Sequence, residues 1–224
     1  MKYSIQIAGI RDQQEAEMLM ACGVDWLGFP LRLTVHEEDL LEAEAAQIIK
    51  SLRPPHAGVL ITYLNQADEI VAFCQGLGVR KVQLHSEISL DQLKAVKALA
   101  PNVFVIKSLI VHQNNQSELE AEVRSLSPHV DAFITDTYDP VSGACGATGK
   151  THDWKVSRRL VQISPRPVIL AGGLRPENVA RAISEVRPAA VDAHTGVEGS
   201  NGRKDVQLVR VFVEQARAAF TKAV

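Results

Sequence analysis

The chain alternates short aliphatic runs with longer stretches of helical periodicity, and this alternation recurs eight times along its 224 residues. Runs rich in Val, Ile and Leu that stand between turn signals are typical of buried strands. The predicted strands are residues 3–8, 24–29, 58–63, 81–85, 103–109, 132–135, 167–171 and 189–193. The predicted helices are residues 12–21, 38–52, 66–77, 90–99, 116–126, 154–163, one that opens at the capping pattern of residues 175–178, and 206–220. Few two-residue hairpin signals separate the strands, so the sequence predicts a parallel sheet built from βα units.

Eight βα units in a row predict a closed (β/α)8 barrel, the TIM barrel, forming one α/β domain over residues 1–224. An open, doubly wound sheet is the structural alternative, because periodicity alone does not say whether a sheet closes. The first loop, Ala8 to Asp12, lacks the G-x-G-x-x-G pattern of a dinucleotide site. The count of eight favours closure.

Composition and charge narrow the class of protein. With 46% hydrophobic residues, 22% charged residues and a net charge of -2, the chain is typical of a globular protein that binds neither nucleic acid nor a membrane surface. No apolar run reaches the ~18 residues of a membrane helix and no signal-peptide pattern opens the chain, so we expect a cytoplasmic protein. Cys22, Cys74 and Cys145 lack metal-ligand spacing, so we expect reduced thiols and no metal. The helix patterns are compatible with a monomer or a homodimer.

Glycines follow the last two predicted strands. Gly172 and Gly173 come after residues 167–171, and Thr195 and Gly196 come after residues 189–193. Glycine lets the backbone approach a ligand closely, and unpaired N–H groups at such turns bind oxyanions. In (β/α)8 barrels the loops after strands 7 and 8 commonly hold phosphate. The sequence therefore predicts that these four residues bind a phosphate group.

Polar residues also end most of the other predicted strands, where a closed barrel carries its active site. These residues are Arg32, Gln83, His85, Lys107, Asp136 and His194. Arg32 and Gln83 are candidate substrate-binding residues, and the other four are candidate catalytic residues. Each also has a structural interpretation: Lys107 can neutralise a neighbouring carboxylate, and His85 can be a capped loop histidine.

Several motifs together resemble those of the phosphoribosylanthranilate isomerase family. Residues 7–10 (IAGI) match the family's K-I-C-G-I, residues 82–85 (VQLH) match V-Q-L-H-G, and residues 150–154 (KTHDW) match G-K-T-F-D-W. Asp136-Thr137, residues 170–179 (LAGGLRPENV) and residues 191–205 (VDAHTGVEGSNGRKD) extend the match, the last against V-D-V-S-S-G-V-E-x-x-G-x-K-D. The resemblance covers essentially the whole chain. It implies a (β/α)8 barrel and an isomerase of tryptophan biosynthesis that takes a phosphorylated sugar as substrate and needs no cofactor.

The resemblance also implies a reaction, an Amadori rearrangement of a phosphoribosylated aromatic amine. A general acid protonates the furanose ring oxygen, and a general base removes the C2 proton. The family's acid position is Asp136 here, but the family's basic cysteine is replaced by Ala8. The loop after the second strand departs as well, because Arg32 and His36 stand out of register with the family's S-x-R segment. The acidic residues 37–39 that follow are interpreted as a charge cluster at a helix N-terminus.

Another residue must then supply the base. His194 stands where the family has serine and is slightly preferred, because neutral histidine is the commonest biological base. An equally open interpretation is that His194 only hydrogen-bonds a phosphate oxygen. His85 and Lys107 are the other candidates. Cys145 is considered incidental, because no basic residue beside it in the sequence lowers its pKa.

Three functions remain open. The first is the family isomerase with an altered base, and complementation of a tryptophan auxotroph tests it. The second is an isomerase, epimerase or lyase acting on another phosphorylated sugar, for which no neighbouring tryptophan operon is expected. The third is a non-catalytic phosphosugar-binding protein, which a ligand would stabilise without turnover.

Overall fold

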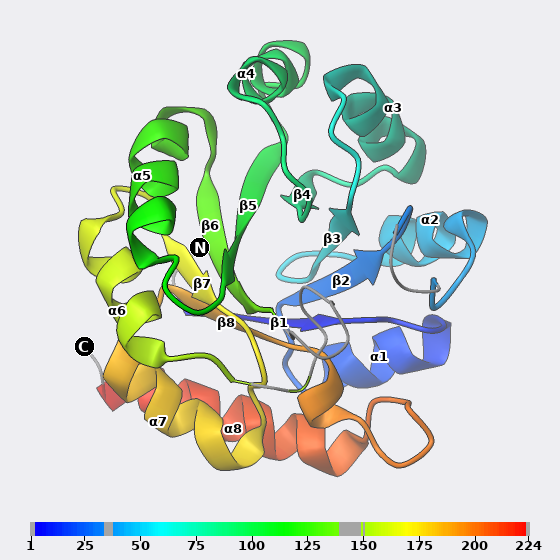
Figure 1. Cartoon of the computed structure of the whole chain (residues 1–224). Helices are drawn as coiled ribbons and strands as arrows, with labels where there is room; N and C mark the ends of the chain where they lie inside the picture. The colour runs from blue at the N-terminus through cyan, green and yellow to red at the C-terminus, as the bar shows by residue number, and fades with distance from the viewer. Residues whose placement is uncertain (1–2, 34–37, 139–148, 150, 223–224) are drawn as a thin grey trace.

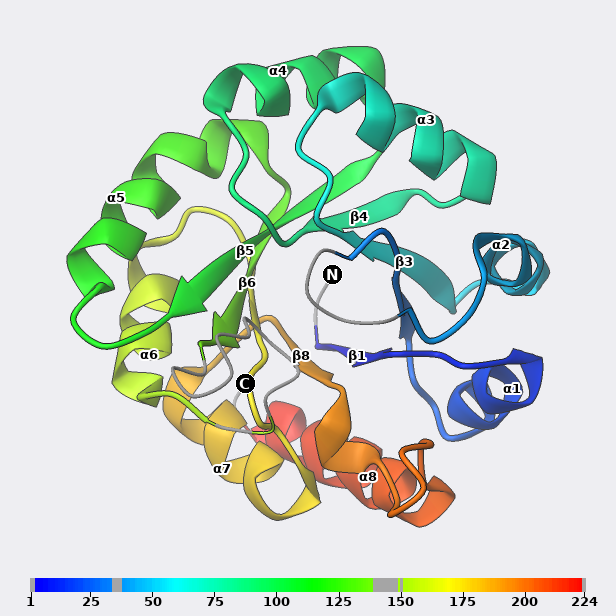
Figure 2. The ribbon, with the colours of Figure 1, turned by 45° about the vertical axis from the view of Figure 1, so that its right-hand side comes forward.

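The structure, a computed structural model, describes residues 3–33, 38–138, 149 and 151–222. Its strands form a closed parallel barrel in chain order, with β8 paired to β1 (Figure 1, Figure 2). The strands are β1 (Ser4–Ala8), β2 (Trp26–Pro30), β3 (Ala57–Thr62), β4 (Lys81–Leu84), β5 (Phe104–Val111), β6 (Ala132–Thr137), β7 (Val168–Leu170) and β8 (Ala190–Ala193). The helices are α1 (Gln13–Ala21), α2 (Glu42–Ser51), α3 (Ala67–Leu77), α4 (Leu90–Leu99), α5 (Gln116–Leu126), α6 (Trp154–Ile163), α7 (Pro176–Val186) and α8 (Val206–Lys222), with short 3-10 turns η1 (Ser127–His129) and η2 (Thr195–Val197). The predicted (β/α)8 barrel is confirmed, and the open sheet is excluded.

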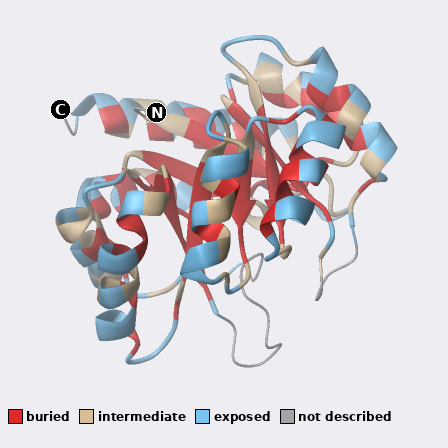
Figure 3. Ribbon diagram, turned by 90° about the horizontal axis from the view of Figure 1, so that it is seen from above, coloured by how far each residue is buried: buried red, intermediate tan, exposed pale blue. Residues whose placement is uncertain are grey.

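Side chains along each strand alternate between the barrel interior and the layer of helices. On β6, Ala132 and Ile134 join the apolar cluster inside the barrel, whereas Phe133 packs in the larger cluster between strands and helices. Continuing this period places Asp136 inside. Figure 3 shows buried residues along the strands and on the helix faces that turn toward them. The alternation therefore decides which polar residue at a strand end can reach the interior.

The N-terminal end of the barrel is closed by stacked side chains from three first strand positions. The ammonium of Lys81 lies 4.9 Å from the ring centroid of Trp26 and 5.1 Å from that of Phe104. The two rings pack edge to face, with their centroids 6.1 Å apart. Burial lowers the pKa of Lys81. Because this end is filled, a ligand site must lie at the opposite, C-terminal end.

Most helix boundaries agree with those predicted from the sequence, and capping residues define several of them. Asp12 accepts a hydrogen bond from the N–H of Glu15 at the start of α1, and Ser89 accepts one from Gln92 at the start of α4. Gly78 ends α3 with φ of 74°, a left-handed conformation that suits glycine.

The helix predicted over residues 38–52 begins later, at Glu42 in α2. The carboxylate of Glu38 accepts a hydrogen bond from the main-chain N–H of Arg32, and Asp39 pairs with Arg11. For Glu38 and Asp39 the interpretation as a helix N-terminal cluster was therefore wrong, because α2 begins after them and their carboxylates bind Arg32 in the same loop and Arg11 in the loop after β1. His36 and Glu37 lie outside the described residues.

Two of the three cysteines can be placed. Cys22 and Cys74 are free thiols, and burial raises the pKa of Cys74 to about 12, which makes it a poor nucleophile. Cys145 lies outside the described residues. Among the described helices, none is long and apolar enough to span a bilayer.

Candidate active site

A cavity of about 290 Å³ opens at the C-terminal ends of the strands. Three groups of residues line it, and they differ in chemistry. Glycines and a threonine from the loops after β7 and β8 form one side, namely Gly172, Gly173, Thr195 and Gly196. Apolar residues from β1 to β3 form another side, namely Ala8, Pro30, Leu33 and Ile61. Titratable and polar side chains lie between or above them, namely Arg11, Asp39, Tyr63, Gln83, His85, Asp136, Asp192, His194 and Glu198.

The glycine side has room for the backbone alone. A Cβ on Gly172 would lie 2.2 Å from Oγ1 of Thr137, and a Cβ on Gly196 would lie 1.9 Å from the carbonyl oxygen of Leu174. Gly172 also has φ of 94°, which side chains rarely adopt. The two predicted loops thus meet in one wall of the cavity, with α7 beginning directly after it. An oxyanion there would meet backbone rather than side chains.

Two buried carboxyl groups project into the cavity, one from β6 and one from β8. Burial raises the pKa of Asp136 to about 7, although the N–H of Thr137 donates to its carboxylate at 2.8 Å and opposes the shift. The pKa of Asp192 is raised well above its ordinary value by burial and by the charge of Asp136. Oδ1 of Asp192 is buried without a hydrogen-bond partner among the described residues. Near neutral pH this pair therefore retains a proton that it can transfer.

A chain of hydrogen bonds crosses the interior beneath these carboxyls. Nε2 of Gln6 donates to Oε1 of Gln83 at 3.2 Å, and Nε2 of Gln83 donates to Oγ of Ser108 at 3.4 Å. The same hydroxyl lies 3.0 Å from Nδ1 of His85, whose ring meets the edge of Tyr63 with centroids 5.0 Å apart. Such a chain fixes the side-chain conformations of Gln83 and His85 at the cavity wall.

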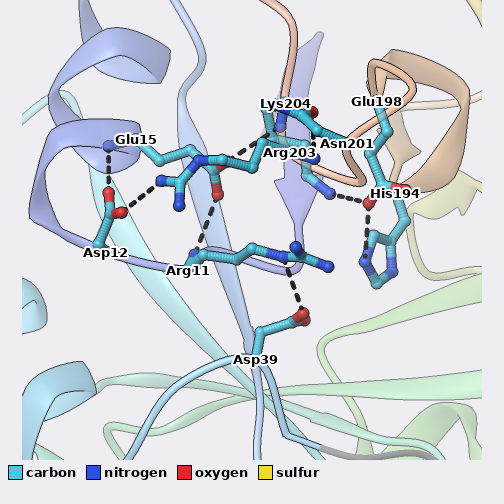
Figure 4. A network of polar contacts seen from close by, with 9 residues as sticks. All are labelled: Arg11, Asp12, Glu15, Asp39, His194, Glu198, Asn201, Arg203 and Lys204. Carbon is cyan, nitrogen blue, oxygen red and sulfur yellow. Dashed lines mark hydrogen bonds and ion pairs between the residues drawn. The ribbon is translucent and has the colours of Figure 1, made fainter.

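His194 follows β8 and leans over the end of β1. A Cβ on Gly9 would lie 2.1 Å from Nε2 of His194, so the ring rests directly on Gly9, beside Ala8. Oε1 of Glu198 lies 3.5 Å from Nε2, and the ammonium of Lys204 lies 2.6 Å from that oxygen (Figure 4). A carboxylate beside Nε2 favours a proton on that nitrogen.

Two of the predicted site residues lie outside the cavity. Lys107 points outward from β5, where its ammonium donates to the carbonyl of Ser108 at 2.7 Å and lies 3.4 Å from Oε1 of Glu122 on α5. Its neighbour Ser108 takes the inward position, because successive side chains alternate across the sheet. The structural interpretation of Lys107, neutralisation of a carboxylate, fits this geometry.

Arg32 also turns away from the cavity. Its guanidinium lies 3.8 Å from the ring centroid of Phe73, and its Nε donates to Glu42 at 2.8 Å. Arg32 thus joins the loop after β2 to α2 and α3. Hydrogen bonding to Glu42 raises the pKa of Arg32 against a smaller opposing effect of burial.

Four charged or titratable cavity residues were missed by reasoning from strand ends, namely Arg11, Asp39, Asp192 and Glu198. Asp192 interrupts the apolar run of residues 189–193, and an acidic residue inside a buried strand was the available signal. Nε of Arg11 lies 3.3 Å from Oδ1 of Asp39, a pairing between two separate loops that no local sequence pattern announces. Within the described part of the chain, no group of three or more His, Cys, Asp or Glu side chains could hold a metal ion.

Comparisons with known proteins extend these observations. The family model described as N-(5'phosphoribosyl)anthranilate (PRA) isomerase matches residues 5–215. The N-(5'-phosphoribosyl)anthranilate isomerase 2 of Methanosarcina mazei is 39% identical over 219 residues, which cover 97% of this chain and 96% of the relative. The isomerase of Methanothrix thermoacetophila is 35% identical over 214 residues, covering 96% of this chain and 98% of the relative.

Solved structures of the same family superpose on the barrel. The phosphoribosyl anthranilate isomerase of Thermotoga maritima gives a TM-score of 0.81 at 27% identity, covering 96% of this chain and 99% of that structure. An isomerase in complex with reduced 1-(o-carboxyphenylamino)-1-deoxyribulose 5-phosphate gives a TM-score of 0.79 at 25% identity, with the same coverage of both chains. With a family model matched over nearly its whole length and relatives above 30% identity, this chain belongs to the N-(5'-phosphoribosyl)anthranilate isomerase family.

Proposed function

We propose that the protein isomerises N-(5'-phosphoribosyl)anthranilate to 1-(o-carboxyphenylamino)-1-deoxyribulose 5-phosphate, an Amadori rearrangement of tryptophan biosynthesis. The observation that carries the proposal is one cavity that combines a glycine-lined anion wall with the carboxyl of Asp136 and the imidazole of His194. The phosphate lies against Gly172, Gly173, Thr195 and Gly196, where backbone N–H groups hold it without a metal.

Asp136 acts as the general acid in this proposal. It protonates the furanose ring oxygen, so that the ring opens and the amine nitrogen forms a protonated Schiff base with C1. A carboxyl with a pKa of about 7 suits this step, because a useful fraction is protonated at neutral pH. The pKa of Asp192 is also raised, so this neighbouring carboxyl adds less negative charge beside the reacting groups.

His194 acts as the general base in this proposal. The imidazole removes the proton from C2, the electrons move toward the Schiff base, and an enolamine forms that tautomerises to the ketose. Glu198 supports the charged imidazolium that results, because its carboxylate lies 3.5 Å from Nε2. The position beside Ala8 brings the ring to the end of β1, opposite the acid on β6.

A turnover assay tests the proposal. Purified protein is given N-(5'-phosphoribosyl)anthranilate, and consumption is followed by the loss of its fluorescence; the same gene is tested for growth of a tryptophan auxotroph that lacks this isomerase. We expect turnover and growth. Turnover that is no faster than in a sample without protein would reject the proposal.

A second function is favoured by one observation. Ala8 offers no titratable group at the end of β1, so the part of the cavity that holds the reacting sugar carbons could bind another phosphorylated sugar. In that case the protein would bind the phosphate yet leave the anthranilate compound unchanged. Binding with no turnover of any phosphosugar would instead indicate a non-catalytic binding protein.

A further inference from the structure

We infer that Arg11 recognises the carboxylate on the aromatic ring of the substrate, an inference that rests on the proposed function. The proposed substrate carries two anionic groups, a phosphate at one end and an aryl carboxylate at the other. The glycine wall accounts for the phosphate. The second anion needs a partner of its own in the same cavity.

Part of the cavity wall is apolar and suits a flat aromatic ring. Pro30, Leu33 and Ile61 line it from β2, the following loop and β3. Of the described residues that line the cavity, Arg11 alone is a lysine or arginine, whereas Asp39, Asp136, Asp192 and Glu198 all carry carboxyl groups. An aryl carboxylate entering this cavity would be repelled unless it reached a cation, and Arg11 is the cation available.

The guanidinium of Arg11 is held in place at one edge. Its Nε lies 3.3 Å from Oδ1 of Asp39, and its main-chain N–H donates to Glu15 at 3.0 Å (Figure 4). The two Nη atoms pack beside Gly202, where a Cβ would lie 3.3 and 3.5 Å from them. These Nη groups form no hydrogen bond with another described residue. The two Nη groups of Arg11, which can bind a carboxylate in bidentate fashion, are therefore held by a side chain that is already positioned.

Arg32, which the sequence indicated as a substrate-binding residue, is engaged elsewhere. It stacks on Phe73 and bonds Glu42, both outside the cavity. The structure thus favours Arg11, in the loop after β1, over Arg32, in the loop after β2, as the cation that contacts the substrate. This difference supplies a matched pair of variants, Arg11→Gln and Arg32→Gln.

The test compares binding of two stable reduced compounds by titration calorimetry. One is reduced 1-(o-carboxyphenylamino)-1-deoxyribulose 5-phosphate, and the other is the phenylamino compound that lacks the carboxylate. We expect the wild-type protein to prefer the first by ~10- to 100-fold, which is the range for charge-assisted hydrogen bonds. Arg11→Gln should abolish the preference while leaving affinity for the second compound nearly unchanged. Arg11→Lys should keep part of it, and Arg32→Gln should keep all of it.

Three results would overturn the inference. The first is loss of the preference in Arg32→Gln but not in Arg11→Gln, and the second is an equal loss of affinity for both compounds in Arg11→Gln. The third is no preference in the wild-type protein. Thermal unfolding of each variant identifies any that fails to fold, and Arg11→Lys then carries the test. Because binding is measured apart from turnover, a wild-type protein that binds with preference but shows no turnover rejects only the proposed function.

Discussion

Asp136 on β6 and Asp192 on β8 line the same cavity, where burial and, after it, the charge of Asp136 raise the pKa of Asp192. Burial acts on each in the same direction. The carboxyls of Asp136 and Asp192, on the two strands that flank β7, therefore keep protons to higher pH than exposed carboxyls do. Two consequences can be measured, one in the rate and one in the stability.

Asp136→Asn should lower kcat/KM for N-(5'-phosphoribosyl)anthranilate by ~10²-fold or more, because the amide keeps the shape but has no transferable acidic proton. In the wild-type protein kcat/KM should fall about tenfold per pH unit above pH ~7, as Asp136, with its pKa of about 7, loses its proton. The measurement is a pH-rate profile of both proteins. An alkaline limb that is unchanged in the asparagine variant would remove Asp136 from the acid role.

The stability of the fold should depend on the same carboxyl with a definite sign. The native pKa of about 7 exceeds the ordinary value of 3.8, so the folded protein binds the extra proton between these values. Asp136 thus costs stability progressively as pH rises from ~4 to ~7, and the cost is constant above that window. At pH 8 Asp136→Asn should therefore be more stable than the wild type by a free energy of unfolding on the order of a few kcal/mol, which raises its Tm by several degrees. At pH 4 the difference in Tm should disappear.

Asp12→Asn provides a control of opposite sign. Burial acts to raise the pKa of Asp12, but hydrogen bonds from the N–H of Glu15 and from Arg203 outweigh it and leave the pKa lowered. Asp12 then contributes stability above its unfolded pKa and loses it on acidification. Asp12→Asn should lower Tm at neutral pH and have less effect below pH ~3. Parallel pH dependence in both variants would contradict the assignment.

The base assignment is tested by exchanging the two candidate positions. His194→Asn should lower kcat by ~10²-fold or more, and Ala8→Cys in that background should restore part of the loss by placing a thiol beside the same carbon. In the wild-type background we expect Ala8→Cys to add little, because the imidazole already occupies the end of β1. Rates of the four proteins decide. Full activity in His194→Asn, or a large gain from Ala8→Cys alone, would contradict the role of His194.

Gly173→Asp should weaken binding of the reduced ribulose phosphate compound by at least ~10-fold, because like charges a few ångströms apart repel by more than ~1 kcal/mol. Gly173→Asn is the matched control, since both residues tolerate the positive φ of 61° and only one adds charge. Calorimetric titration compares the two. Equal losses in both variants would show that shape, and not charge, is at issue, and would argue against an anion at this wall.

The barrel could be predicted because eight buried runs and the spacing between them are properties of the local sequence. The direction in which Lys107 points could not, because β5 is buried on both faces and its aliphatic pattern does not mark which residues face inward. Asp192 was missed for a related reason: it lies within β8, and reasoning from strand ends considered only what followed the strand. The pairing of Arg11 with Asp39 depends on how two loops approach each other in space, which no short window of sequence contains.

The pairing of β1 with β8 has a consequence for how the chain folds while it is being synthesised. Strand β1 receives its second neighbour only from residues 190–193, and Arg203 reaches back across 191 positions to Asp12. The chain leaves the ribosome N-terminus first, so one hydrogen-bonding edge of β1 stays unpaired until residues 190–193 have been made. Contacts so distant along the chain form slowly. Truncation before residue 190 should therefore yield a polypeptide that aggregates through that edge, and the loop carrying Glu198, Arg203 and Lys204 would be the last segment to lock the ring shut.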